Sequence, residues 1–310
     1  MSIKRLEPGD VLDLPGAAIA IGNFDGVHKG HQALCRLTVD RAAAQQGRPV
    51  ALTFDPHPAR VLSPDRAPAE LMTIDQKCEA LLGCGIAEVV VVPFTPVLSE
   101  ETPEEFARLV LADALGAHTV VVGTYFRFGH NRQGTVGVLR ELGGEVGFDV
   151  VPVEPVLHDG LPISSSRIRE AVVRGDVEEA ERMLGRPLFV DGRVVEGDKR
   201  GRALGIPTAN LEVVGETQLA RGVYAGRCRI PEADPAGRHP CVVNVGHRPT
   251  FGGSATIFEA HLLDFEGDLY DRRLRVELIS RLRDERRFES PEALAGQIRL
   301  DIDRARKLVS

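Results

Sequence analysis

Five short apolar runs alternate with helical segments through the first half of the chain, and this alternation restricts the fold more than any other feature. The runs are AAIAI (17–21), VALTF (50–54), AEVVVV (87–92), HTVVV (118–122) and FDVVPV (148–153). Continuous runs of this kind are typical of strands buried on both faces. The segments with helical spacing between them are residues 31–46, 75–83 and 103–115. Strands that alternate with helices predict right-handed crossovers and an α/β domain with a parallel sheet.

The pattern changes near residue 185. Two short helices are expected at 166–174 and 177–184, each followed by a glycine. The strand-forming runs beyond them have no helices between them: FVDGRVVEG (189–197), GVYAGRCRI (222–230), CVVNVG (241–246), TIFEAHLLDF (256–265) and RRLRVELISRL (272–282). This predicts an all-β domain, a barrel or a sandwich. We therefore expect two domains, residues 1–185 and 186–310, because 310 residues exceed what one core usually covers.

A helix is expected at the C-terminal end of the sequence. Ser290 is a good N-cap and Pro291 suits the first helical position. The apolar positions that follow form one stripe: Leu294, Ile298, Ile302 and Ala305. We expect this stripe to pack on the β domain.

The charge and the cysteines exclude several classes of protein. The formal net charge is −7, so a nucleic-acid partner is not expected. No stretch approaches 18 uninterrupted apolar residues, and MSIKRLEPGDVLDLPG lacks the apolar core of a signal peptide. The five cysteines lack the C-x-x-C spacing of a zinc site or a redox pair. We expect a cytoplasmic protein with no membrane contact.

The first strand and the first helix are joined by GNFDGVHKGH (22–31), which contains the pattern G-x-H-x-G-H. Ligands of open α/β sheets bind at the carboxyl ends of the strands, where this turn lies. Glycines allow a phosphate to approach the backbone, and a helix N-terminus offers free amide donors. A pair of histidines can also be ordinary cap residues, but this glycine-rich setting favours phosphate binding. The candidate residues are Gly22, Asn23, Gly26, His28 and His31.

A second polar stretch, ISSSRIRE (163–170), opens the helix that follows the last strand of the same sheet. Serines before a helix are usually caps. Here the hydroxyls and the helix amides can also bind a pyrophosphate, whose charge Arg169 can neutralise.

These motifs resemble the FMN adenylyltransferase domain of prokaryotic bifunctional riboflavin kinase/FAD synthetases, as do TFDPHP (53–58) and FRFG (126–129). The resemblance implies a Rossmann-like nucleotidylyltransferase domain in which His28 and His31 contact the ATP phosphates during adenylyl transfer. It also implies that Asn23 lies in that site and that Ser164, Ser165 and Arg169 form a second phosphate-binding stretch. Two positions depart from the family: Ser166 replaces a threonine, and Tyr125 replaces an aspartate or asparagine.

A second candidate site lies in GDKRGRALGIPTANL (197–211), a basic, glycine-rich segment that leads into Pro-Thr-Ala-Asn. Glycines and cations suit a loop that folds over phosphates, and oxygens of Thr208 and Asn210 suit Mg²⁺. A β-hairpin with a basic rim is the alternative. The candidate phosphate-binding residues are Gly197, Lys199, Gly201, Gly205 and Thr208, and the candidate metal ligands are Thr208 and Asn210.

This segment, with GVYAG (222–226), NVGHRPTF (244–251), FEAHLLDF (258–265) and RDERRFES (283–290), resembles the riboflavin kinase domain across most of residues 186–307. The resemblance implies a riboflavin kinase-like β-barrel with a terminal helix. It also implies that Glu259 is the base for the ribityl 5′-hydroxyl. A lone strand glutamate is otherwise most often a solvent-exposed residue.

The sequence therefore predicts a bifunctional enzyme that makes FMN from riboflavin and FAD from FMN, with ATP as co-substrate and Mg²⁺ as cofactor. The alternative is a riboflavin kinase whose adenylyltransferase domain is weak or inactive because of Tyr125. A third hypothesis is a cytidylyltransferase-like domain fused to a β-barrel binding module without activity. Expected partners are small molecules, and a weak homo-oligomer is compatible with the sequence.

Overall fold

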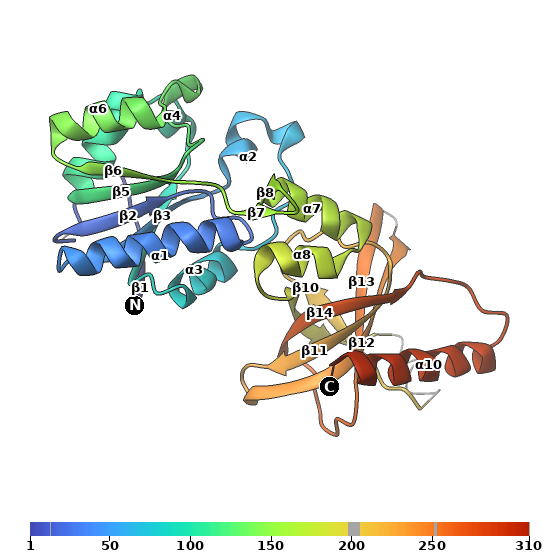
Figure 1. Cartoon of the computed structure of the whole chain (residues 1–310). Helices are drawn as coiled ribbons and strands as arrows, with labels where there is room; N and C mark the ends of the chain where they lie inside the picture. The colour runs from blue at the N-terminus through green and yellow to red at the C-terminus, as the bar shows by residue number, and fades with distance from the viewer. Residues whose placement is uncertain (13, 198–204, 251–252, 310) are drawn as a thin grey trace. The chain divides into compact units, whose positions relative to one another are not determined.

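The structure, a computed structural model, describes residues 1–12, 14–197, 205–250 and 253–309 (Figure 1). The chain divides into two compact units, Met1–Ser165 and Ser166–Ser310. Each unit has its own sheet, so the change of pattern in the sequence corresponds to a real change of architecture.

The first unit is built on a parallel sheet of six strands in the order β1-β4-β3-β2-β5-β6. The strands are β1 (Ser2–Arg5), β2 (Ala17–Ile21), β3 (Pro49–Asp55), β4 (Glu88–Pro93), β5 (Ala117–Gly123) and β6 (Asp149–Val153). The five predicted strands are confirmed. The edge strand β1 was not predicted, because its sequence, SIKR, is short and mostly polar.

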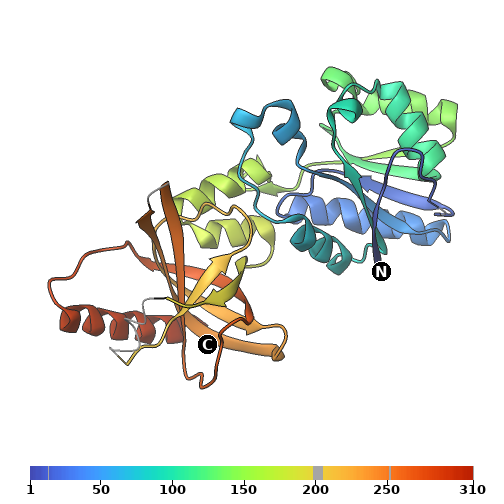
Figure 2. The same ribbon diagram turned by 180° about the vertical axis from the view of Figure 1, so that it is seen from behind.

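Helices cover both faces of this sheet (Figures 1 and 2). The three predicted helices are confirmed as α1 (Lys29–Ala44), α3 (Ile74–Gly83) and α5 (Pro103–Glu105), which continues into the π-helical segment η2 (Phe106–Ala114). The other helical elements are α2 (Pro58–Leu62), η1 (Pro64–Arg66), α4 (Pro96–Ser99), η3 (His130–Arg132) and α6 (Val136–Val146). Helix α6 was not predicted because its glycines weaken the helical pattern, although Leu139 and Leu142 bury one face.

The strand order places a ligand site at one position of the sheet. From β2 the chain builds outward through β3 to β4, and it then returns to the other side of β2 to form β5 and β6. The carboxyl ends of β2 and β5 therefore lie at the point where the strand order reverses, which is where open α/β sheets bind their ligands. The β2–α1 turn is located there.

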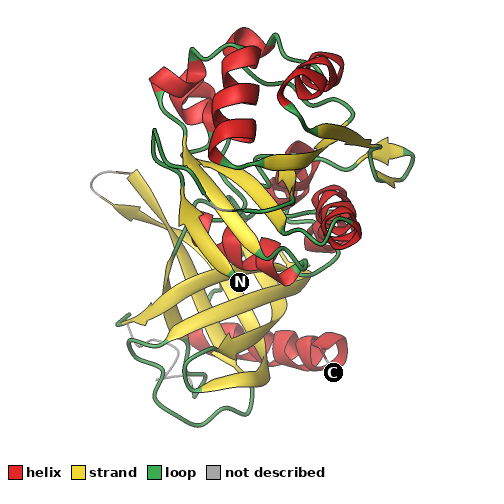
Figure 3. Ribbon diagram, turned by 90° about the vertical axis from the view of Figure 1, so that its left-hand side faces the viewer, coloured by secondary structure: helices red, strands yellow, loops and turns green. Residues whose placement is uncertain are grey.

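The second unit contains a closed barrel of six antiparallel strands in the order β10-β13-β12-β11-β14-β9 (Figure 3). The strands are β9 (Leu188–Val195), β10 (Ala209–Val213), β11 (Gly222–Ile230), β12 (Asp234–Thr250), β13 (Gly253–Leu262) and β14 (Arg273–Arg283). The all-β prediction is confirmed, and the structure resolves its form as a barrel. Strand β10, which was not among the predicted strands, carries the second half of the Pro-Thr-Ala-Asn tetrad.

Two helices precede the barrel, α7 (Ser165–Arg174) and α8 (Val177–Leu184), and both agree with the predicted ranges. Helix α8 contacts β9 and β14. The Arg281 guanidinium donates to the carbonyl of Arg174 at the end of α7 (3.3 Å) and to that of Arg221 (2.6 Å). These contacts associate α7 and α8 with the barrel. The predicted boundary between residues 185 and 186 would instead assign both helices to the first domain. That boundary stays a prediction.

The C-terminal helix is α10 (Pro291–Val309), which packs against β11, β12 and β14. Its predicted N-cap is present, since the Ser290 hydroxyl accepts from the amide of Ala293 at 3.2 Å. Of the predicted stripe, Ala305 and Ile302 join Val309 in a cluster with barrel side chains. Among the helices that the structure describes, none combines the length and the apolar character needed to cross a membrane.

Candidate functional sites

The β2–α1 turn is held in an unusual backbone conformation. Phe24 (φ 50°), Gly26 (φ 83°) and Val27 (φ 40°) all have positive φ, which only glycine adopts without strain. The carboxylate of Asp25 is buried and accepts from the backbone amides of Leu71 and Met72 at 3.0 to 3.2 Å. Asp25 thus links the turn to the segment that precedes α3.

The two predicted histidines stand together at the start of α1. His28 is the N-cap, and its Nδ1 accepts from the backbone amide of His31 at 3.3 Å. The two rings stack with centroids 3.6 Å apart, and Phe24 packs edge-on against His31. Since Nδ1 of His28 is an acceptor, a neutral His28 carries its proton on Nε2. The turn therefore presents a hydrogen-bond donor beside the free amides of a helix N-terminus.

The surroundings of His31 favour its neutral form. Burial, the neighbouring His28 and the ammonium of Lys77 together hold the pKa of His31 well below its ordinary value. The Nδ1 atom of His31 is buried and has no hydrogen-bond partner among the described residues. Lys77 lies in the first turns of α3 and is only 1% exposed. The Nδ1 atom of His31 is therefore suited to a hydrogen bond with a bound ligand, because a buried polar atom without a partner is costly.

The other predicted residues of this site are placed as follows. Asn23 is exposed, and its Nδ2 lies 3.4 Å from Nε2 of His57. The Ser165 hydroxyl donates to the backbone carbonyl of Asp25 at 2.9 Å, so the serine stretch meets the turn. Ser164 is the neighbour of Ser165 and is half-buried. Arg169 lies one helical turn further along α7, in the second unit, and its part in this site stays a prediction.

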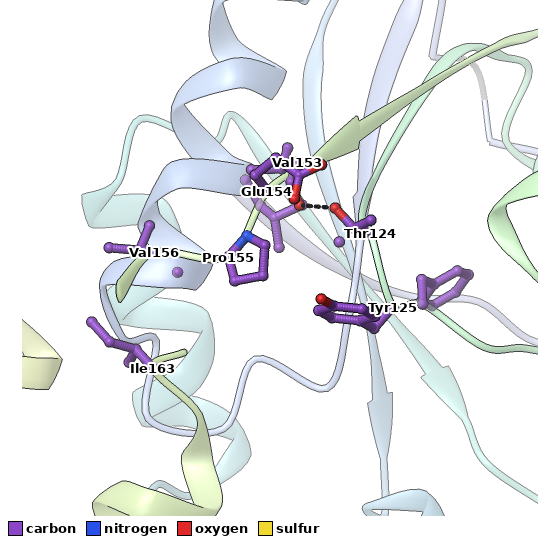
Figure 4. A pocket seen from close by; sticks show the side chains of 11 residues that line it. Thr124, Tyr125, Val153, Glu154, Pro155, Val156 and Ile163 are labelled. Atoms are coloured by element: carbon purple, nitrogen blue, oxygen red, sulfur yellow. Dashed lines mark hydrogen bonds between the residues drawn. The ribbon is translucent and has the colours of Figure 1, made fainter. Parts of the chain in front are cut away.

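A cavity of about 200 Å³ lies beside Gly30, the residue before His31, and Figure 4 shows the residues after β5 and β6 that line it. It is lined by Gly30 and Leu34 of α1, by residues 123–126 and 153–156 after β5 and β6, and by Ile163. The Thr124 hydroxyl joins the two strand ends through a hydrogen bond to the carbonyl of Val153 (3.0 Å). Tyr125, the residue that departs from the family pattern, is 77% exposed at the edge of this cavity.

On the barrel, the strand register brings three polar residues into one row. Asn210 of β10 is paired with Glu259 of β13, and Glu259 is paired with Asn244 of β12. All three are half-buried, while the alternate residues Phe258 and Ala260 point into the barrel. The row therefore lies on the outer face of the barrel, with the two predicted residues Asn210 and Glu259 side by side.

The ends of the glycine-rich segment lie beside this row. A Cβ on Gly197 would be 2.2 Å from Nδ2 of Asn210, so only glycine permits this approach. Gly205 (φ 72°) and Thr208 are exposed, and Nδ1 of His261 lies 2.7 Å from the carbonyl of Pro207. Lys199 and Gly201 lie outside the described residues.

A larger cavity of about 690 Å³ lies elsewhere in the second unit. It is bordered by Val173, Val190, Phe258 and segments 211–213 and 215–221. The predicted kinase residues do not line it.

Sequence reasoning missed Asp25, Lys77 and Asn244. Lys77 had a detectable signal, because it occupies a position on the buried stripe of α3 with Cys78 and Leu81. Asn244 became notable only through the pairing of β12 with β13, which links positions far apart in the sequence.

Comparisons with known proteins assign a family to each half of the chain. The FAD synthetase family matches residues 12–167, and the riboflavin kinase family matches residues 184–309. A bifunctional riboflavin kinase/FMN adenylyltransferase of Pseudomonas fluorescens is 40% identical over 95% of this chain and 94% of its own. The enzyme of that name from Escherichia coli K12 is 36% identical over 92% and 90%.

One solved structure matches the whole fold. A crystal structure described as a macrolide-efflux protein from Streptococcus pneumoniae superimposes with a TM-score of 0.88, at 30% identity, over 98% of both chains. Since both family matches and the curated relatives extend over nearly all of the sequence, the chain belongs to the family of bifunctional riboflavin kinase/FMN adenylyltransferases.

Proposed function

We propose that this chain makes FAD in two steps at two separate sites. Riboflavin is phosphorylated by ATP on the outer face of the barrel, and the FMN produced is adenylylated by ATP at the β2–α1 turn. The observation that carries this assignment is that each of the two ranges matched by a family contains its own group of polar residues. One is the stacked His28–His31 pair at a helix N-terminus, and the other is the Asn210–Glu259 pair across β10 and β13.

In adenylyl transfer, a phosphate oxygen of FMN attacks the α-phosphorus of ATP in line, and pyrophosphate leaves. The reaction needs no group on the protein to form a covalent bond. Its requirement is that donors meet the charge that develops on the phosphates. His28, neutral His31 and the amides of α1 supply these donors, and Ser164, Ser165 and Arg169 bind the pyrophosphate portion.

The cavity beside Gly30 is the site we assign to the adenine ring. It adjoins the phosphate-binding turn, and its walls include the apolar side chains of Leu34, Pro155 and Ile163. Its volume of about 200 Å³ is below the roughly 300–1,000 Å³ typical of drug-sized ligands, which suits one ring system.

In the kinase reaction, the ribityl 5′-hydroxyl of riboflavin attacks the γ-phosphorus of ATP, and Glu259 accepts the hydroxyl proton. The side-chain oxygens of Thr208 and Asn210 are hard donors, and neither residue makes another side-chain hydrogen bond in the described part of the chain. They fit Mg²⁺, which prefers oxygen ligands. Bound there, the ion would neutralise phosphate charge. Gly197, Lys199, Gly201 and Gly205 form the phosphate loop.

We place the boundary between the catalytic domains at residues 185/186. We also propose that the protein lies in the cytoplasm, where ATP is available. We expect small-molecule substrates and no nucleic-acid or membrane partner. A weak homo-oligomer is compatible with this function.

The test is a time course with purified protein, riboflavin, ATP and Mg²⁺, with the flavins separated by chromatography. FMN should form first and FAD should follow. A preparation that accumulates FMN without FAD would instead support a kinase whose adenylyltransferase is weakened at Tyr125. Glu259→Gln should stop FMN formation from riboflavin while FAD still forms from added FMN. Loss of both reactions in the folded variant would contradict the assignment of separate sites.

A further inference from the structure

Asn244 occupies the third position of the polar row on the barrel, next to Glu259 on the side opposite Asn210. Its Nδ2 donates to Oε2 of Glu259 over 3.5 Å, a long hydrogen bond between directly paired residues. Both residues are half-buried, so solvent screens this contact only in part. A neighbouring donor of this kind fixes the orientation of a carboxylate.

A second carboxylate borders the same patch. Oε1 of Glu285 lies 2.9 Å from the position that a Cβ on Gly246 would take, and Nδ2 of Asn244 lies 3.9 Å from that position. Gly246 follows Asn244 by two residues on β12, so both lie on one face of the strand. Among the described side chains, Glu259, Glu285 and His261 lie at this patch, and Arg283 follows beyond Val223, the partner of Asn244 on β11. A neutral residue at position 244 keeps further negative charge away from Glu259.

We propose that Asn244 is a positioning residue for the kinase reaction: its amide holds Oε2 of Glu259, so that Oε1 is left to accept the proton of the attacking hydroxyl. This inference rests on the proposed function, because it takes Glu259 to be the base. Asn244 acts on the rate of phosphoryl transfer and not on the affinity for riboflavin. Its effect is confined to the barrel site.

The experiment measures kcat and KM for riboflavin in the full chain, for the native protein, Asn244→Ala and Asn244→Asp. Asn244→Ala should lower kcat about 10- to 100-fold with little change in KM, equal to about 1.4–2.7 kcal/mol of activation free energy. Asn244→Asp replaces the amide donor by a carboxylate of the same shape, which cannot donate to Glu259, and should lower kcat at least as much as Asn244→Ala.

Two controls accompany these variants. Gln218→Glu adds the same charge as Asn244→Asp at an exposed position in the segment after β10 and should leave kcat unchanged. Far-UV circular dichroism and thermal unfolding establish that each variant barrel is folded. Adenylylation of added FMN by the same preparation should match that of the native protein.

The outcomes separate the two levels of the proposal. If Glu259→Gln retains phosphorylation, the assignment of the base is wrong. If Glu259→Gln is inactive but Asn244→Ala or Asn244→Asp has the native kcat, the role of Asn244 is overturned and the base assignment stands.

Discussion

At the scale of single residues, the β2–α1 turn shows how burial selects a protonation state. His31 is neutral in the folded protein because burial comes first in lowering its pKa, followed by His28 and Lys77. A neutral imidazole can both accept and donate hydrogen bonds, so His31 keeps this capacity down to a pH well below its ordinary titration range near 6.5. The low pKa reduces the stability of the folded state as the pH falls below the ordinary range, because the unfolded chain then binds a proton at this histidine that the folded chain does not.

The variant Lys77→Met tests the contribution of the buried lysine. Removing the ammonium removes one of the charges that disfavour protonation of His31, so the pKa of His31 should rise while staying below its ordinary value. The folded protein should then lose less stability as the pH falls below about 6.5. Titration of the His31 ring protons by NMR measures the shift. An unchanged titration of His31 would show that Lys77 does not act on this ring.

At Gly197, the lack of a side chain allows the backbone to approach Asn210 closely. A Cβ there would be 2.2 Å from Nδ2 and 2.4 Å from Cγ of Asn210. Gly197→Ala should displace Asn210 and lower the rate of riboflavin phosphorylation at least about tenfold, equal to about 1.4 kcal/mol. FAD formation from added FMN should be unaffected.

The matched control is Gly296→Ala in α10, where a Cβ meets nothing within 4 Å. Alanine there should keep the kinase rate and increase stability, by up to about 1 kcal/mol. Equal kinase rates for the two alanine variants would contradict the importance of the close approach at Gly197.

At the scale of elements, the edge strand β1 is attached to the sheet by one buried carboxylate. Glu88 of β4 is 1% exposed and receives the Lys4 ammonium at 2.6 Å and the Ser2 hydroxyl at 3.0 Å. Burial alone would raise the pKa of Glu88, but Lys4, Ser2 and Arg48 outweigh it and hold this pKa below its ordinary value. The charged carboxylate therefore stabilises the folded state above about pH 4.5, and this contribution is lost as the pH falls through the folded pKa.

Glu88→Gln should loosen β1 at neutral pH. We expect the amides of β1 and β4 to exchange with solvent faster, by an amount equal to about 1 kcal/mol, because the partly exposed Lys4 and the exposed Ser2 lose a charged acceptor. The difference from the native protein should shrink as the pH falls below about 4.5. Hydrogen–deuterium exchange with peptide resolution measures this. Glu7→Gln, the same change at an exposed position, serves as the control, and equal exchange in both variants would refute the role of Glu88.

Strong local patterns in the sequence predicted most of the elements, and tertiary contacts determined the rest. The five buried strands of the first unit were predictable because each is a continuous apolar run. Strand β1 needs its pairing with β4, and β10 needs its pairing with β9 and β13, so neither is evident from its own residues. The histidine motif predicted the first candidate site, whereas Asp25 and Lys77 required the contact between the turn and α3.

At the scale of the whole molecule, the two sites belong to different compact units, with His31 in the first and Asn210 in the second. Each unit has its own sheet and its own hydrophobic cluster. A substitution in one site is therefore expected to leave the other site's structure intact, because each site is supported by the core of its own unit. Since each site uses a separate ATP, FMN is the only molecule that must move between them.

Complementation between two inactive variants tests this independence. His31→Ala should convert riboflavin to FMN and stop there, and Asn210→Ala should convert added FMN to FAD but leave riboflavin unchanged. A mixture of the two should make FAD from riboflavin, because FMN released by the first variant can diffuse to the intact turn of the second. The double variant should make neither product.

If the mixture accumulates FMN without FAD while Asn210→Ala alone remains active on added FMN at that concentration, FMN would have to pass between sites without release. If either single substitution abolished both reactions in a folded protein, the assignment of one activity to each unit would fail.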